Sequence, residues 1–346
     1  MSREKHIYRG LSKAKERALE IATEISDMKW IIFSDHHRGC RDGADDFLSC
    51  EPTYVKALKY YLEKGYTLLL LGDVEEFWEN TFRRVIKSYE NVLDLEKQFY
   101  NQDRLYRVWG NHDDNWRFQG ALNKHMGWLF PKLEAFESIN LNIQREGQSL
   151  GEILFLHGHQ GTLASERIAG ISKFFVRYVW RNFQRVFKTP LSTPSKNVKL
   201  KSQHDLAMYG WASTKKGSIL ICGHTHQPVF MSLTHADKVT YELQELELKS
   251  NDSEGEIKKV IEMEIQRLRK LLDEIEIEKQ GTHLYVPKRK PCYFNSGCCS
   301  FADGDITGLE IADGKIQLIK WIPAKQEKLL LDSAYLHRIL SKCSED

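Results

Sequence analysis

The sequence predicts an α/β fold in which buried strands alternate with helices. Short apolar runs end abruptly in polar residues at five places, the first two being "MKWIIF" before Ser34 and "YTLLLL" before Gly72. Helical patterns such as "TYVKALKYYLEKG" separate the early runs. This alternation favours βαβ units and a substantially parallel sheet, in which ligands gather beyond the carboxyl ends of the strands.

The predicted elements begin with a helix over about Ser12 to Ser26. The five strands that end in polar motifs lie in "MKWIIFSDHH", "YTLLLLGDVEEFW", "RLYRVWGNHDD", "EILFLHGHQG" and "SILICGHTH". Three further strands are predicted near the end of the chain, in "PCYFNSGCCSF", "ITGLEIADG" and "KIQLIKWIPA". We expect these three to form an antiparallel edge that is joined by an Asp-Gly turn.

Composition limits the class of protein. A chain of 346 residues, 41% of them hydrophobic, can bury a real core as one large domain with insertions or as two ordinary domains. The formal net charge of +2, from 50 basic and 48 acidic residues, predicts neither nucleic-acid nor membrane binding by itself. Seven cysteines without C-x-x-C spacing indicate reduced thiols rather than a disulfide framework or a zinc ribbon.

The distribution of apolar residues indicates a location for the protein. No run of about 18 apolar residues is available to span a bilayer. The first ten residues, "MSREKHIYRG", do not contain the apolar stretch of a secretory signal. We therefore expect a cytoplasmic protein, with peripheral attachment to the inner face of a membrane as an alternative that depends on a basic segment in the middle of the chain.

This locally basic segment spans residues 165–204. It contains one acidic residue and nine basic ones: Arg167, Lys173, Arg177, Arg181, Arg185, Lys188, Lys196, Lys199 and Lys201. Four of the basic residues are spaced four apart in "GISKFFVRYVWRNFQRVFK", which places them along one helix face. One reading is a solvated helix face. The other is a cap in which Arg177, Arg181 and Arg185 hold substrate phosphates while aromatic residues contact an acyl chain, a base or a membrane surface.

A second insertion, a heptad helix, is predicted over residues 245–280. Ser253 and Glu256 match a capping box at its start. Five apolar residues then follow in steps of four and three: Ile261, Ile265, Leu268, Leu272 and Ile275. Because this seam spans fewer than three full heptads, it favours a helix packed on its own domain, or a short homodimer contact, over a free coiled coil.

Polar residues at the strand ends are the candidates for chemistry. Alternation in an extended chain sends residues two apart to the same side, so Asp35 and His37 are predicted to share a side while His36 points away. The same spacing relates His224 and His226. Side chains paired in this way can bind one metal ion or two adjacent ions.

Three more strand ends contribute Asp73, Asn111 and His157, which gives seven oxygen and nitrogen donors and no cysteine. This mixture suits manganese, iron or zinc, and disfavours an all-oxygen calcium site or a thiolate site. Each residue alone could equally cap a helix or bond within its loop. Seven together favour a metal site, and they suit two ions, which lie about 3.5–4 Å apart in two-metal hydrolases.

Five motifs together resemble the blocks of the calcineurin-like metallophosphoesterase superfamily: "SDHHRG", "GDVEEFW", "GNHDD", "HGHQG" and "GHTHQP". Each block alone is a weak signal, but five in the order of the family, each after an apolar strand, are specific. The blocks run from Ser34 to Pro228. The resemblance implies a four-layer α-β-β-α sandwich in one domain over residues 1–346, with the cap and the heptad helix as insertions.

The resemblance also implies a role for each of the seven donors. The first metal ion would be held by Asp35, His37 and His226. The second would be held by Asn111, His157 and His224. Asp73 would bridge the two ions. The cofactors implied are two divalent metal ions, with manganese expected and iron or zinc as alternatives.

The implied reaction is phosphoester hydrolysis. The ions would polarise the phosphoryl oxygens and lower the pKa of a shared water, so that metal-bound hydroxide attacks phosphorus in line. His112 would stabilise the developing charge or protonate the leaving oxygen, and Asp113 would orient its imidazole. Glu76 would support the site, whereas His159 would either touch the substrate or bond within its loop.

Within the superfamily, the sequence is similar to the UDP-2,3-diacylglucosamine hydrolases. The similarity lies in "GDVEEFW" and in the basic, aromatic insertion between "HGH" and "GHTHQP". His112 departs from that family, which tends to carry arginine at this position. We therefore expect hydrolysis of a phosphomonoester, phosphodiester or diphosphate, on a UDP-sugar lipid or on another lipid-linked or nucleotide substrate.

Two alternatives remain. The first is a nuclease, because repair nucleases of the superfamily also carry an Asn-His-Asp block and the arginine row could contact nucleic-acid phosphates. Salt-sensitive DNA binding distinguishes it. The second is a non-catalytic scaffold that keeps the fold and binds partners through the heptad seam. Such a scaffold should lack some of the metal ligands, and the sequence retains all seven.

Overall fold

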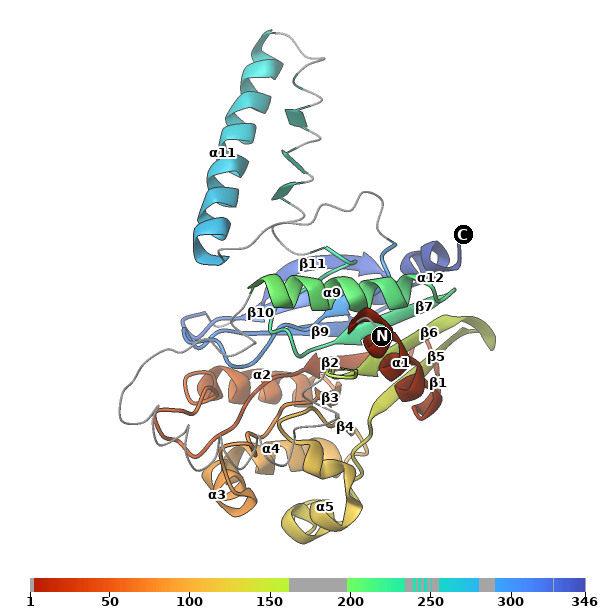
Figure 1. Ribbon diagram of the computed structural model, residues 1–346, viewed down its shortest axis with the longest axis vertical. Coiled ribbons are helices and arrows are strands. Elements are labelled where there is room, and N and C mark those ends of the chain that lie inside the picture. Colours follow the sequence, from red (N-terminus) through yellow and green to blue (C-terminus); the bar gives the residue numbers. More distant parts are fainter. Residues whose placement is uncertain are drawn as a thin grey trace.

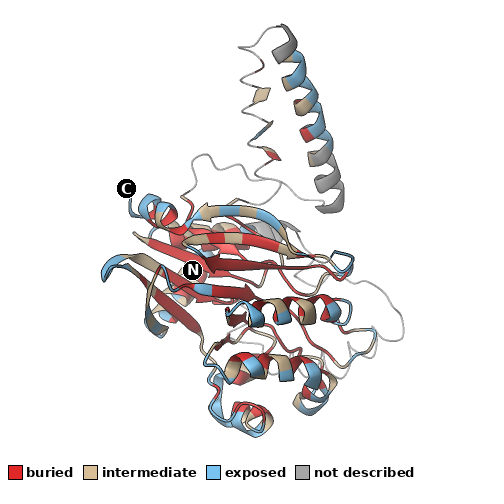
Figure 2. Ribbon diagram, turned by 180° about the vertical axis from the view of Figure 1, so that it is seen from behind, coloured by how far each residue is buried: buried red, intermediate tan, exposed pale blue. Residues whose placement is uncertain are grey.

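The structure is a computed structural model that describes residues 3–161, 198–233, 255–279, 290–325 and 327–345, together with parts of 239–250. Its centre is a pair of facing sheets (Figure 1). One is six-stranded, in the order β11-β10-β9-β2-β3-β4, and the other is five-stranded, in the order β1-β5-β6-β7-β8. The inner strands of both sheets are largely buried (Figure 2), whereas the outer strands β1 and β11 are partly exposed.

The six-stranded sheet contains the three early strands that the apolar runs predict. They are β2 (Lys29–Phe33), β3 (Thr67–Leu71) and β4 (Leu105–Val108), and they pair in parallel. The connections are helical: α2 (Glu51–Glu63) between the first two, then α3 (Phe82–Ser88) and α4 (Glu90–Tyr100). The predicted βαβ units are therefore confirmed.

Alternation along β2 explains how this sheet is buried on both faces. Ile31 and Phe33 pack in the cluster that includes residues of α2 and α4. Trp30 and Ile32 pack in the cluster that includes the strands of the other sheet. Because both faces meet apolar neighbours, the strand reads as a continuous apolar run.

The five-stranded sheet is mixed in direction. Its strands are β1 (Leu19–Glu24), β5 (Ser138–Arg145), β6 (Gln148–Leu156), β7 (Ser218–Cys222) and β8 (Tyr293–Asn295). Three helices pack on its outer side: α1 (Arg3–Glu16), α9 (Val198–Ser213) and α12 (Leu336–Ser344). Since α2 and α4 cover the other sheet, the four-layer α-β-β-α sandwich is confirmed.

The antiparallel hairpin near the end of the chain is also confirmed. It joins β9 (Ile306–Ala312) to β10 (Lys315–Trp321) through Asp313 and Gly314, which have φ of 51° and 69°. The edge of the sheet is instead β11 (Leu329–Tyr335), because β9 pairs with β2 in the interior. The strand in "PCYFNSGCCSF" belongs to the other sheet, as β8 parallel to β7.

The prediction for the start of the fold is wrong. The opening helix ends at Glu16 rather than near Ser26, and Leu19–Glu24 is a strand that pairs in parallel with β5. Its first four residues alternate between partly buried and exposed, a pattern that fits a strand at the side of a sheet. The five motif-bearing strands divide between the two sheets: β2, β3 and β4 pair in parallel in one, and β6 pairs in parallel with β7 in the other.

The two predicted insertions differ in how far the structure describes them. Residues 162–197, with most of the basic segment, lie outside the described residues, and α9 follows them. The helix α11 (Gly255–Lys279) lies within the predicted heptad range, outside the sandwich (Figure 1). Its seam residues Leu268 and Leu272 pack against Val239, Leu243 and Leu246 of the preceding segment.

The remaining elements are the short helix η1 (Asp114–Arg117) and the helix α5 (Gln119–Met126), which follow β4. All seven cysteines lie within the described part of the chain and have free thiols, as the sequence predicts. None of the helices formed by the described residues has the length and apolar character needed to cross a membrane.

Candidate metal centre

The seven predicted metal ligands lie in loops that leave the strands of both sheets. The loops after β2 and β3 run side by side, because the Asp35 and His37 N–H groups donate to the carbonyls of Gly72 (3.1 Å) and Asp73 (2.9 Å). The loops after β6 and β7 approach them from the other sheet, where the Gly223 N–H donates to the His157 carbonyl at 3.0 Å. The centre therefore lies beyond the carboxyl ends of strands, as the sequence predicts, and these strands come from both sheets.

The backbone of the ligand loops is left-handed rather than extended. Five predicted ligands have positive φ: Asp35 (52°), His37 (51°), Asp73 (50°), His224 (70°) and His226 (57°). Alternation along an extended strand, which predicts that Asp35 and His37 share a side, is therefore not the reason that these side chains lie close together. The left-handed region costs a residue other than glycine about 1–2 kcal/mol, and such strain gathers at functional sites.

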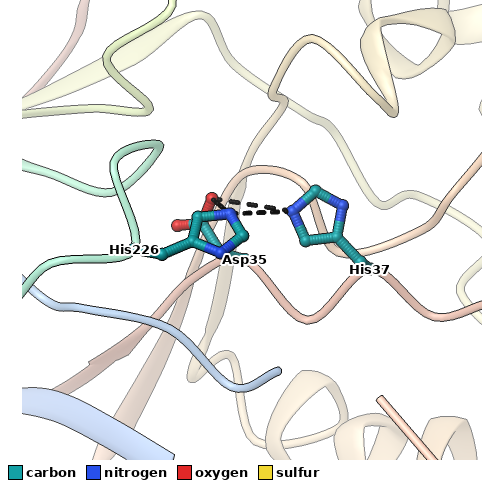
Figure 3. Close-up of side chains that lie close together, drawn as sticks. All are labelled: Asp35, His37 and His226. Atoms are coloured by element: carbon teal, nitrogen blue, oxygen red, sulfur yellow. Dashed lines mark hydrogen bonds and ion pairs between the residues drawn. The ribbon is translucent and has the colours of Figure 1, made fainter. Parts of the chain in front are cut away.

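The first group consists of Asp35, His37 and His226 (Figure 3). The Nε2 atom of His226 lies 3.2 Å from Asp35 Oδ1 and 3.1 Å from His37 Nε2. Asp35 Oδ2 is occupied, because it accepts hydrogen bonds from Ser34 Oγ (2.5 Å) and from the His224 N–H (2.9 Å). These contacts turn the other carboxylate oxygen toward the two imidazoles.

The second group consists of Asp73, His157 and His224. The Nε2 atom of His157 lies 3.0 Å from Asp73 Oδ2, and the same oxygen lies 3.9 Å from His37 Nε2 in the first group. Asp73 therefore lies between the two groups. His157 Nδ1 donates to the Leu71 carbonyl at 2.9 Å, which leaves Nε2 as the lone-pair nitrogen of the neutral ring.

Buried polar atoms among the predicted ligands show that this donor set fits divalent cations. Among the described residues, Asp35 Oδ1, Asn111 Oδ1 and His157 Nε2 are buried and make no hydrogen bond. Asp73 and His226 approach two of these atoms closely, but not along hydrogen-bond directions. A buried polar atom without a partner is costly, and cations bound at the two groups would give Asp35 Oδ1 and His157 Nε2 partners.

Glycines in the motifs make room for ligands from other motifs. A Cβ on Gly110 would lie 2.1 Å from Asp73 Oδ1, and a Cβ on Gly72 would lie 2.5 Å from the His157 ring. A Cβ on Gly223 would lie 2.5 Å from Asp35 Oδ2. The Gly-Asp, Gly-Asn and Gly-His pairs in the sequence therefore have a packing cause: the glycine admits a side chain from a distant loop.

Charges within the centre oppose the effect of burial on its pKa values. Burial raises the pKa of Asp73, but the imidazoles of His157, His112 and His37 outweigh it and hold that pKa well below its usual range. Burial lowers the pKa of His157, yet the carboxylates of Asp73 and Asp35 raise it to about 9. At both residues the attraction between carboxylate and imidazole therefore outweighs the effect of burial.

His112 is oriented by Glu76 and not by Asp113. Its Nδ1 lies 2.6 Å from Glu76 Oε2. The Asp113 carboxylate is buried and accepts hydrogen bonds from the Val74 N–H (2.9 Å) and the Gly110 N–H (2.6 Å). The prediction that Asp113 orients the imidazole is therefore wrong, because its side chain turns inward and ties the loop after β4 to the loop after β3.

Other predicted residues lie around the centre. The His36 ring points away from it and packs edge-on against Tyr54, with ring centroids 4.7 Å apart. His159 is buried, with its ring centroid 5.6 Å from that of His157. The cap residues Arg177, Arg181 and Arg185 lie outside the described residues.

His204 belongs to none of the five motifs, but the fold brings it beside the centre. Its Nε2 donates to the Gly158 carbonyl at 2.7 Å, and its ring centroid lies 5.2 Å from that of His224. Asn295 similarly supports the last motif, because its Nδ2 donates to the Gly223 carbonyl at 2.6 Å. Neither residue belongs to a motif, so only the folded chain identifies them.

The fold and the two ligand groups together define a metal-dependent phosphoesterase. Residues 28–228 match the calcineurin-like phosphoesterase family, which is more than half of the chain, and the protein belongs to this family. It is therefore a hydrolase that acts on phosphoesters. No curated protein shows a significant match to the sequence.

Proposed function

We propose that the protein hydrolyses a phosphoester or diphosphate bond at a centre of two divalent cations. The proposal rests on the geometry of two three-residue groups, one around Asp35 and one around Asp73, whose carboxylates each have an oxygen 3.9 Å from His37 Nε2. Seven donors are more than one transition-metal ion needs, whereas two ions that share Asp73 can use them. The mixture of imidazole, carboxylate and carboxamide supports manganese, with iron or zinc as alternatives.

Different residues of the chain would hold each of the two cations. Asp35, His37 and His226 would hold one cation, and Asn111, His157 and His224 the other, with Asp73 between them. Bound cations of this kind polarise phosphoryl oxygens and supply an acidified water as nucleophile. The chain positions them through the hydrogen bonds that orient its ligands, such as that from His157 Nδ1 to the Leu71 carbonyl.

His112 would act on the leaving group. Glu76 occupies Nδ1, so Nε2 is the nitrogen available to stabilise charge on the phosphoryl group or to protonate the leaving oxygen. The His112 side chain is 24% exposed, whereas that of His157 is fully buried. This difference supports His112 as the imidazole that reaches a substrate, and Asp113 as support for the loop that carries it.

A UDP-sugar lipid, or another lipid-linked or nucleotide phosphoester, is the substrate class that we propose. The motif "GDVEEFW" and the basic insertion at 165–204 support it, with Arg177, Arg181 and Arg185 as phosphate-binding residues and His159 as a further contact. Cytoplasmic location, peripheral contact with the inner face of a membrane, and a homodimer belong to the same proposal. The histidine at position 112 favours the second candidate, a nuclease.

A substrate panel tests these proposals. Metal-free protein is loaded with Mn²⁺ and assayed on a UDP-diacylglucosamine, cyclic nucleotides, phosphomonoesters and single-stranded DNA. Selective cleavage of the UDP lipid supports the lipid-linked substrate, and salt-sensitive cleavage of DNA supports the nuclease. The proposed function would be overturned if the protein bound two ions per chain but hydrolysed neither the substrates of the panel nor a generic aryl phosphodiester.

A further inference from the structure

Trp78 connects the loop after β3 to the loop after β4. Its indole Nε1 donates to the carbonyl oxygen of Asn111 at 2.7 Å. Its ring stacks on the His112 imidazole, with centroids 4.3 Å apart and planes inclined by 17°. Its backbone N–H donates to Glu76 Oε1 at 2.9 Å, while the other oxygen of Glu76 contacts His112 Nδ1. Glu76, Trp78, Asn111 and His112 therefore contact one another, and Glu76 Oε2 also lies 3.3 Å from His37 Nδ1.

These contacts fix different features of His112. A single hydrogen bond to Glu76 sets which nitrogen is occupied but leaves the imidazole free to tilt about that bond. Stacking against a broad indole fixes the plane of the imidazole ring. The hydrogen bond to the Asn111 carbonyl holds the backbone next to His112, so the stacked ring and its support move together.

The position of Trp78 is not explained by the hydrophobic core. Trp116 is 1% exposed and belongs to the core cluster between the six-stranded sheet and its helices. Trp78 is only partly buried, and the described core clusters do not include it. A large aromatic residue outside the core, whose indole N–H and stacking face are both directed at one loop, indicates a role in that loop.

We propose that Trp78 is a positioning residue that aims His112 Nε2 at the leaving-group oxygen. The proposal rests on the proposed function, in which His112 protonates that oxygen. Proton donation matters for a poor leaving group and little for a good one, because a nitrophenolate departs without a proton. Loss of Trp78 should therefore impair hydrolysis in proportion to how poor the leaving group is.

The dependence on the leaving group is tested with two esters that share the same phosphoryl group, methyl 4-nitrophenyl phosphate and methyl phenyl phosphate. Both are assayed with full-length, Mn²⁺-loaded protein. For Trp78→Leu we expect kcat on the phenyl ester to fall at least 10-fold, and kcat on the nitrophenyl ester to fall less than about 3-fold, because general acid catalysis contributes about 100- to 10,000-fold in total. Trp78→Phe retains a stacking ring and should recover most of the lost rate.

Trp128→Leu is the matched control. The Trp128 indole also donates to a backbone carbonyl, that of His125 at 3.2 Å, but it is 60% exposed. Its replacement should change neither rate. Bound metal and melting temperature are measured on every variant, and Trp78→Met replaces Trp78→Leu if the leucine variant does not fold.

The outcomes separate this inference from the proposed function. Equal losses on both esters, or a loss that follows the loss of bound metal, would show that Trp78 only maintains the structure and would overturn the inference alone. Full activity of Trp78→Leu on the phenyl ester would also overturn it. A wild-type protein that binds two ions and hydrolyses neither ester would overturn the proposed function, and the inference with it.

Discussion

Gly110 lies so close to Asp73 that no side chain fits between them: a Cβ on Gly110 would meet Asp73 Oδ1 at 2.1 Å and the Asp73 backbone nitrogen at 2.4 Å. The proposed bridging carboxylate is therefore held by the shape of a neighbouring loop as well as by its own hydrogen bonds. One of these comes from the His112 N–H, at 2.8 Å.

Gly110→Ala should displace the Asp73 carboxylate. Overpacking of this kind costs about 1–3 kcal/mol, and here it acts on a proposed ligand. We expect weaker Mn²⁺ binding by isothermal titration calorimetry and at least a 10-fold fall in kcat. Gly120→Ala is the control, because a Cβ on Gly120 meets nothing within 4 Å. Equal behaviour of the two variants would show that the close approach has no consequence for the centre.

Asp73→Asn should remove the bridging charge while keeping the shape of the side chain. We expect kcat on bis(4-nitrophenyl) phosphate to fall at least about 100-fold, since even a residue that only supports a metal ligand is worth about 10- to 100-fold. Bound manganese, measured by elemental analysis, should fall from two equivalents. Asp94→Asn, on the exposed face of α4, serves as the control and should change neither quantity. Wild-type activity in Asp73→Asn would contradict its bridging role.

Glu76→Gln should lower kcat, whereas Asp113→Asn should lower the free energy of unfolding. Glu76 contacts the His112 imidazole, so its replacement should lower kcat about 10- to 100-fold with little effect on unfolding. Asp113 accepts one N–H on each oxygen, and an asparagine has one acceptor, so one buried N–H loses its partner. That loss costs about 1–3 kcal/mol of unfolding free energy, measured by urea denaturation. If Asp113→Asn lowered kcat as Glu76→Gln does, with unfolding unchanged, Asp113 would orient His112 after all.

Removal of metal should destabilise the folded protein. Cations that bind only the native state stabilise it by about 2.7 kcal/mol at a concentration 100 times the dissociation constant. We expect EDTA to lower the melting temperature of Mn²⁺-loaded protein by several degrees, and expect a smaller change in Asp73→Asn. Calorimetry measures both. An unchanged melting temperature in the wild-type protein, with metal loss confirmed by elemental analysis, would argue against a cation among these loops.

The sequence predicts those parts of the fold in which the local pattern decides the structure. β2 and β3 are apolar on both faces and end in a polar motif, so their existence and ends can be read directly. β1 is partly exposed and short, and its pattern does not distinguish it from the end of a helix. Whether strands belong to one sheet or two depends on contacts between distant segments, which no local pattern carries.

The same division applies to the centre. The order of the motifs is enough to propose the seven ligands, but not the backbone that presents them. Two acids compete for His112: Asp113 is its neighbour in the chain, while Glu76 lies in another loop. Only the folded loops show that Glu76 faces the imidazole and that Asp113 faces the amides. His204 and Asn295 lie outside the sequence motifs, so the sequence alone does not identify them.

Anomalous diffraction from crystals grown with Mn²⁺ tests the two-cation centre most directly. We expect two manganese peaks about 3.5–4 Å apart, with the Asp73 carboxylate bound to both. One peak should lie among Asp35, His37 and His226, and the other among Asn111, His157 and His224. A single peak, or two peaks that do not share Asp73, would contradict the centre as proposed here.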